Sequence, residues 1–73
     1  MFTVKVRFSD GHESVKETKE VFYMPPEGSR GWRVMYRDFG NDDILYEIED
    51  GDVYVMNESG RTVANYTLTK RQS

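Results

Sequence analysis

The chain has no cysteine, a single histidine, two prolines and no long hydrophobic run in its 73 residues. Without cysteine it cannot form disulfides, and without a Cys/His cluster it cannot build a structural zinc site. The absence of cysteine also fits a reducing compartment. No apolar run approaches the roughly 20 residues that cross a bilayer, and the N-terminus lacks a signal-peptide pattern. We therefore expect a cytoplasmic protein that has no membrane segment.

Residue patterns that carry catalysis are also missing. The one histidine, His12, falls in an expected turn, and no serine lies in a nucleophile motif. The glycines form neither a P-loop nor a GxGxxG fingerprint. The acidic residues on either side of Gly51 lack the alternating carboxylates and the bidentate glutamate of a calcium loop. These absences predict a non-enzymatic protein without a metal or a cofactor.

Period-two alternation of apolar residues is the main structural signal in what remains. It is clearest in residues 2–8, and it recurs in residues 32–37 and 44–49. Turn residues separate these runs: Asp-Gly at 10–11 and 50–51, the loop PPEGSRG at 25–31, and DFGNDD at 38–43. At this length there is room for one domain. We expect one β domain over residues 1–69 and a frayed tail over residues 70–73.

Residues 13–24 are the most ambiguous segment. Residues 13–20 are polar except for Val15, which is typical of an edge strand kept soluble by charge. Ser14 followed by Glu17 resembles a helix capping box, so a short helix is the alternative. We favour a strand, because Asp-Gly returns the chain antiparallel and because an apolar helical stripe is missing. The predicted fold is an all-β, six-stranded antiparallel meander, curled into a barrel or a strongly twisted sheet.

Residues 53–68 are predicted to form a hairpin around the turn at residues 57–60. Asn57 and Gly60 suit a type I turn with a left-handed glycine. This turn would place Met56 opposite Thr62, Val55 opposite Val63 and Tyr54 opposite Ala64. Both faces of the hairpin would then be partly apolar, and the sequence leaves open which face is buried. Three residues on the second face could form an aromatic hot spot for a partner, namely Tyr54, Met56 and Tyr66.

Charge is distributed unevenly along the chain, although the net charge is only −3. Residues 1–37 hold seven basic and five acidic side chains, whereas residues 38–69 hold eight acidic side chains against Arg61 alone. The densest acidic stretch has six carboxylates and no base: Asp42, Asp43, Glu47, Glu49, Asp50 and Asp52. Such an edge can dock on a basic surface of a partner protein. It can equally serve to keep a small β protein soluble.

An alternative binding surface interleaves cations with aromatic side chains: Arg30, Trp32, Arg33, Tyr36 and Arg37. Single-strand nucleic-acid binders use this combination for backbone neutralisation and base stacking. Two observations oppose nucleic acid here. Trp32 and Tyr36 alternate with Arg33 and Arg37, which favours core aromatics and exposed arginines, and the chain is acidic overall. The same residues could instead line a ligand site, for example for a signal nucleotide, at a subunit junction of a homo-oligomer.

Two segments, FTVKVRFSDGHE and DVYVMNESGRTVANYTL, resemble in style the small accessory proteins of bacteriophages and other mobile elements. The resemblance lies in short strands, Asp-Gly turns, acidity and the lack of cysteine, so it transfers no functional residue. It implies an inhibitor that binds a host-defence enzyme or sequesters a signal nucleotide in the host cytoplasm. The leading hypothesis is therefore a protein-binding module that uses the acidic edge against a basic partner.

Overall fold

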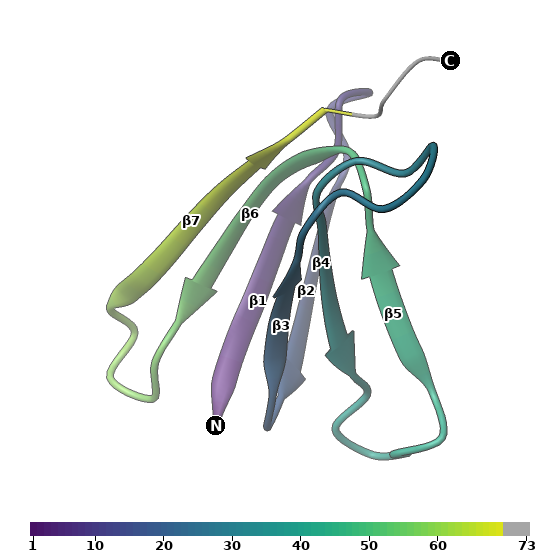
Figure 1. The fold of residues 1–73 in the computed structure, drawn as a ribbon. Coiled ribbons are helices and arrows are strands. Elements are labelled where there is room, and N and C mark those ends of the chain that lie inside the picture. Colours follow the sequence, from purple (N-terminus) through teal and green to yellow (C-terminus); the bar gives the residue numbers. More distant parts are fainter. Residues whose placement is uncertain (70–73) are drawn as a thin grey trace.

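The computed structural model describes residues 1–69, which form seven strands in two antiparallel sheets (Figure 1). The strands are β1 (Phe2–Arg7), β2 (Glu13–Thr18), β3 (Val21–Met24), β4 (Arg33–Arg37), β5 (Leu45–Ile48), β6 (Gly51–Met56) and β7 (Thr62–Leu68). The predicted all-β class is confirmed, and residues 13–18 are a strand rather than a helix. The predicted tail at residues 70–73 lies outside the described residues.

The connectivity differs from the predicted six-stranded meander. One sheet has the order β2-β1-β6-β7 and the other the order β3-β4-β5, so the chain leaves the first sheet after β2 and returns to it at β6. The strand β1 therefore pairs with β6, far along the sequence, with Val4 opposite Val55. The two sheets are separate in their hydrogen bonding, so the described residues form no closed barrel.

The strand predicted over residues 13–24 is broken at Lys19 and Glu20, which gives seven strands instead of six. Thr18, fully buried, stabilises this corner with its hydroxyl. Its Oγ1 donates to the carbonyl oxygen of Glu20 at 3.0 Å and accepts from the Glu20 N–H at 3.3 Å. A short side chain that bonds to nearby backbone offers the chain an alternative to the sheet ladder. The corner contains neither glycine nor proline, so it carries no conventional turn signal.

The core lies between the two sheets and draws side chains from both. A single apolar cluster contains Val4, Val6, Val53, Val55 and Leu68 from the first sheet, and Val34, Tyr36 and Ile48 from the second. Two sheets that each bury one face in a common core form a β-sandwich. Each sheet therefore also has an outer face, which points away from this core.

The β6–β7 hairpin has the predicted turn but a different register beyond it. The Asn57 N–H donates to the Arg61 carbonyl oxygen at 2.9 Å, and Gly60 has the predicted positive φ, +85°. Met56 lies opposite Thr62, as predicted. The next two predicted pairs are wrong, because Val63 is an extra residue that forms a β-bulge.

The bulge determines which face of the hairpin is buried. Beyond it Val55 lies opposite Ala64 and Val53 opposite Tyr66, so these four residues point into the core together. Val63 itself is 53% exposed. A one-residue shift moves every later side chain to the other face of a strand. The apolar residues that the sequence distributes over two faces are thus mostly gathered on one.

Candidate protein-binding surface

The six carboxylates of the predicted acidic edge lie along β5 and continue into β6. Asp42 and Asp43 are in the turn before β5, Glu47 is in β5, Glu49 and Asp50 are in the crossover that follows, and Asp52 is in β6 of the other sheet. The structure brings Glu47 and Glu49 together around Arg30. It places Asp42 and Asp43 at the opposite end of β5 from the crossover, so the six do not form one compact patch.

Four of these carboxylates are engaged by neighbouring side chains. Arg30 forms ion pairs with Glu47 and Glu49, its Nη2 lying 3.1 Å from the Glu49 Oε1. The hydroxyl of Ser9 donates to Asp50 at 2.6 Å, and that of Thr67 donates to Asp52 at 3.0 Å. Within residues 1–69, the carboxylates of Asp42 and Asp43 have no such partner. Hence the acidic turn (Asp42 and Asp43) is the part of the edge whose charge is available to a partner.

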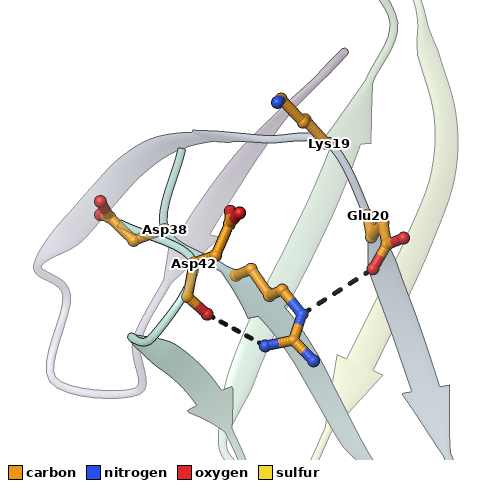
Figure 2. Close-up of a pocket in the computed structure, with 5 residues that line it drawn as sticks. Lys19, Glu20, Asp38 and Asp42 are labelled. Carbon is orange, nitrogen blue, oxygen red and sulfur yellow. Dashed lines mark hydrogen bonds and ion pairs between the residues drawn. The ribbon is translucent and has the colours of Figure 1, made fainter. Parts of the chain in front are cut away.

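A hollow of about 340 Å³ adjoins the acidic turn (Figure 2). It is lined by Lys19, Glu20, Arg37, Asp38 and Asp42. The Nη1 of Arg37 donates to the Asp42 carbonyl oxygen at 3.0 Å, and its Nε lies 3.9 Å from the Glu20 carboxylate. Because Arg37 belongs to β4, these contacts fasten the acidic turn to the sheet.

Asp38 is held rigidly at the side of this hollow. Its two carboxylate oxygens accept from the Gly40 N–H at 3.0 Å and from the Tyr46 hydroxyl at 3.1 Å. The hydrogen bond to Asp38 raises the pKa of the Tyr46 hydroxyl. Burial, with smaller contributions from Tyr46 and Asp38, raises the pKa of Tyr36. Both tyrosines are therefore neutral at pH 7, and Tyr46 acts as a hydrogen-bond donor that positions Asp38.

The outer face of the three-stranded sheet carries a group of apolar residues beside the charged side chains of Arg33, Arg37 and Glu47. Strand alternation and the register place four apolar residues on it, with Phe22 directly opposite Met35: Phe22, Met24, Met35 and Leu45. Phe22 is 41% exposed and Leu45 is 44% exposed. We call these four residues the apolar outer face. Leu45 follows the acidic turn closely in the sequence, so the apolar outer face and the acidic turn are neighbours.

The outer face of the four-stranded sheet also combines apolar residues, among them Val15 and Tyr54, with charged ones. Lys5 and Arg7 project from β1 and form ion pairs with Glu13 of β2, at 3.5 Å and 3.3 Å. The charge of Lys5, together with the hydrogen bond from Arg7, holds the pKa of the Glu13 carboxyl below its usual value. An antiparallel sheet with one solvated face is expected to carry such polar residues there.

The predicted cation and aromatic surface is dispersed in the structure. Arg30 is engaged by two glutamates, Tyr36 is in the core, and Arg37 is fixed at the hollow. Arg33 is buried, not exposed, and Trp32 is 44% exposed, not buried. Tyr36 is therefore a core aromatic and Arg37 an exposed arginine, as strand alternation predicts, whereas Trp32 and Arg33 have the opposite placement.

The loop before β4 explains the burial of Arg33. This side chain lies on the outer side of the sheet, but its Nη2 donates to the Pro25 carbonyl oxygen at 3.3 Å and lies 3.8 Å from the Glu27 carboxylate. Its Nε is buried without a hydrogen-bond partner. Trp32 stacks on Tyr23 with ring centroids 4.6 Å apart. The five residues of the predicted cation and aromatic surface thus do not form one binding surface.

The predicted aromatic hot spot is also divided. Tyr54 and Met56 lie on the outer face of the four-stranded sheet and are half-buried. Tyr66 points to the inner side and stacks on Tyr23, with ring centroids 4.1 Å apart. The bulge at Val63 causes this separation, because it reverses the orientation of the later residues of β7.

The apolar outer face is not among the predicted sites, although the sequence holds a signal for it. Each of the runs 21–24, 33–37 and 44–48 has apolar residues at both odd and even positions. Because successive side chains of a strand point to opposite faces, apolar residues at both odd and even positions indicate a strand with two apolar faces. Residues 53–68 show the same pattern, and there the bulge gathers most of the apolar residues on the buried face. In the three shorter runs the second set of apolar residues forms the apolar outer face.

Comparison with protein-family models, with curated proteins and with solved structures found no match for the chain. Among residues 1–69, no three His, Asp or Glu side chains are grouped so as to hold a metal ion. The same residues include no helix that could cross a membrane.

Proposed function

We propose that the chain is a non-enzymatic protein-binding module that docks a partner on the apolar outer face and the adjoining acidic turn. The observation that carries this proposal is the exposure of Phe22 and Leu45 on one face of the three-stranded sheet, beside the two unpaired carboxylates of the acidic turn. Protein interfaces combine a central apolar patch, in which aromatic residues and methionine are enriched, with a polar rim.

The partner surface that fits this arrangement is apolar at its centre and basic at one side. Asp42 and Asp43 would attract basic groups and orient the encounter, while the apolar outer face would supply most of the affinity. The style shared with accessory proteins of bacteriophages makes a host-defence enzyme the kind of partner we propose. The lack of cysteine agrees with a cytoplasmic setting for this contact.

Capture experiments with surface variants test the proposal. The immobilised chain is incubated with cell lysate, and retained proteins are identified by mass spectrometry. The apolar variant Phe22→Ser/Leu45→Ser should reduce capture of the partner by about tenfold or more, as loss of central interface residues does. The charge variant Asp42→Ser/Asp43→Ser should cause a smaller loss that shrinks at high salt, because it removes long-range attraction.

The chain offers a matched control on the other sheet. Val15 is 59% exposed and Glu17 has no ion-pair partner among the described residues, so Val15→Ser/Glu17→Ser makes similar changes on β2. This control should capture the partner like the wild type. Capture that survives in the apolar and charge variants, with their thermal midpoints unchanged, would refute the proposed surface. Glu47 and Glu49 are left intact, because their removal would also release Arg30 from its ion pairs.

A further inference from the structure

The two sheets have four edge strands, and three of them carry features that oppose pairing with another chain. β2 bears Glu13, Lys16 and Glu17, which charge its edge. β3 and β5 are only four residues long. β3 runs directly into Pro25 and Pro26, and β5 contains Glu47. Charge, proline and short length are the devices by which natural sheets protect their edges.

β7 is the exception among these edges. At seven residues it is the longest described strand, and its sequence TVANYTL has neither charge nor proline. Among residues 1–69 it pairs with β6 alone, and in Figure 1 it lies at the left margin with no described strand beyond it. The bulge at Val63 disturbs its first part, but residues 64–68 continue in regular register. Within the described part of the chain, the outer edge of β7 therefore presents unpaired backbone donors and acceptors to an incoming strand.

We infer that β7 pairs with β7 of a second copy of this chain, antiparallel about a twofold axis, so that two four-stranded sheets become one of eight strands. A copy suits this edge because neither strand is charged, so two copies meet without repulsion at the edge. The twofold arrangement also uses the same surface on both partners and closes after two subunits. β7 has no charged group to select a foreign sequence.

The dimer is expected to be weak. Seven residues at about 3.3 Å each give a contact line of about 23 Å, one strand deep. Such a contact buries less than the roughly 800 Å² per partner found in stable interfaces. The association should therefore depend on concentration, with monomers near 1 μM and dimers in the range of about 0.1 to 1 mM. The apolar outer face belongs to the other sheet and does not take part, so this inference is independent of the proposed function.

Sedimentation velocity on the full chain over this concentration range tests the inference. The wild-type mass should rise from 8.6 kDa toward twice that value. Asn65→Lys places a cation at an exposed position near the middle of the regular run, opposite or diagonal to its copy, and should keep the chain monomeric. The matched control Val15→Lys adds the same charge to the edge strand β2 and should dimerise like the wild type.

A charge-complementation experiment distinguishes the proposed axis from other contacts. Asn65→Lys and Asn65→Glu should each remain monomeric, whereas an equimolar mixture should form a heterodimer, because opposite charges then meet across the axis. A wild-type chain that stays at 8.6 kDa at 1 mM would overturn the inference. So would dimers of Asn65→Lys, loss of dimers in Val15→Lys, or failure of the mixture to associate, provided that each variant keeps the wild-type circular-dichroism spectrum.

Discussion

Gly51 shows how a single residue fixes the connection between the two sheets. It begins β6 with a φ of +112°, and a Cβ at this position would overlap the carbonyl oxygen of Arg7 and lie 3.1 Å from the Cα of Phe8. Glycine is therefore required here for two reasons, its backbone conformation and the close approach of β1. The sequence predicted a tight turn at residues 50–51, but the approach of β1 depends on a strand more than 40 residues away.

A pair of alanine substitutions separates these two requirements. Gly11 has a similar φ of +97°, but a Cβ added there would meet no atom within 4 Å. Gly11→Ala should lower the free energy of unfolding by about 1 to 2 kcal/mol, the cost of the backbone conformation alone. Gly51→Ala should cost about 3 kcal/mol or more, because the backbone of β1 must also move. Urea unfolding of both variants measures the difference, and equal losses would show that the approach of β1 is unimportant.

At the scale of the elements, the bulge in β7 determines the arrangement of the core. Asn57 and Gly60 indicated the turn correctly, and the pairs nearest the turn were predictable from it. The bulge was not, because Val63 is β-branched and fits a regular strand as well as a bulge. What favours the bulge is the burial of Ala64, Tyr66 and Leu68 beside Val53 and Val55, which is a property of the assembled sandwich.

Deletion of single residues in β7 tests this account. Removing Val63 leaves Thr62 opposite Met56 and Ala64 opposite Val55, so the ladder becomes regular and every core residue keeps its orientation. This deletion should change the free energy of unfolding by no more than about 1 kcal/mol. Removing Thr67 instead cannot be absorbed in this way. Leu68 turns out of the core if the bulge is kept, and Tyr66 turns out while Asn65 turns in if the bulge is lost, at about 1.5 to 3 kcal/mol for each apolar side chain. Thermal unfolding compares the two variants, and a Val63 deletion as damaging as that of Thr67 would contradict the assigned bulge.

The remaining elements were predictable where their turns contain glycine or proline. The runs 2–8, 32–37 and 44–49 correspond to β1, β4 and β5 within two residues at each end. The break between β2 and β3 was not predictable, because it depends on the hydroxyl of Thr18 and on burial against the other sheet. Once that corner is missed, two strands merge into one and a sandwich is interpreted as a meander.

At the scale of the whole molecule, contacts between distant segments decide which predicted site residues are available. The sequence located the acidic stretch, but it could not show that Arg30, from the loop before β4, engages Glu47 and Glu49. Nor could it show that loop residues cover Arg33. Local patterns identify residue types that suit binding, whereas availability follows from pairings that only the folded chain creates.

The stability of the sandwich should respond to alkaline pH through Tyr36. Its pKa in the folded chain is raised above the ordinary value of 10.0, mainly by burial. Ionisation therefore favours the unfolded chain. The associated stability is fully present below pH 10 and is lost as the pH rises from there through the raised pKa.

The variant Tyr36→Phe isolates this effect. Relative to its own value at pH 8, its free energy of unfolding should fall less than that of the wild type as the pH increases beyond 10. Urea unfolding at several values between pH 8 and 11.5 measures the two curves, and the pH 8 values remove any difference due to packing. Parallel curves across this range would exclude Tyr36 as a contributor.

The pairing of β1 with β6 also governs how the molecule is made. On the ribosome, Phe2–Arg7 emerges well before its central neighbour Gly51–Met56, because β2 to β5 are synthesised between them. The hairpin of β1 and β2 must wait with one side of β1 unpaired. Pairing that side with β6 closes a long loop, and the entropy of this closure is lost before the new contacts compensate for it. We therefore expect the β3-β4-β5 hairpins to assemble early and the four-stranded sheet to form last. The slow step of folding is then the pairing of β6 with β1.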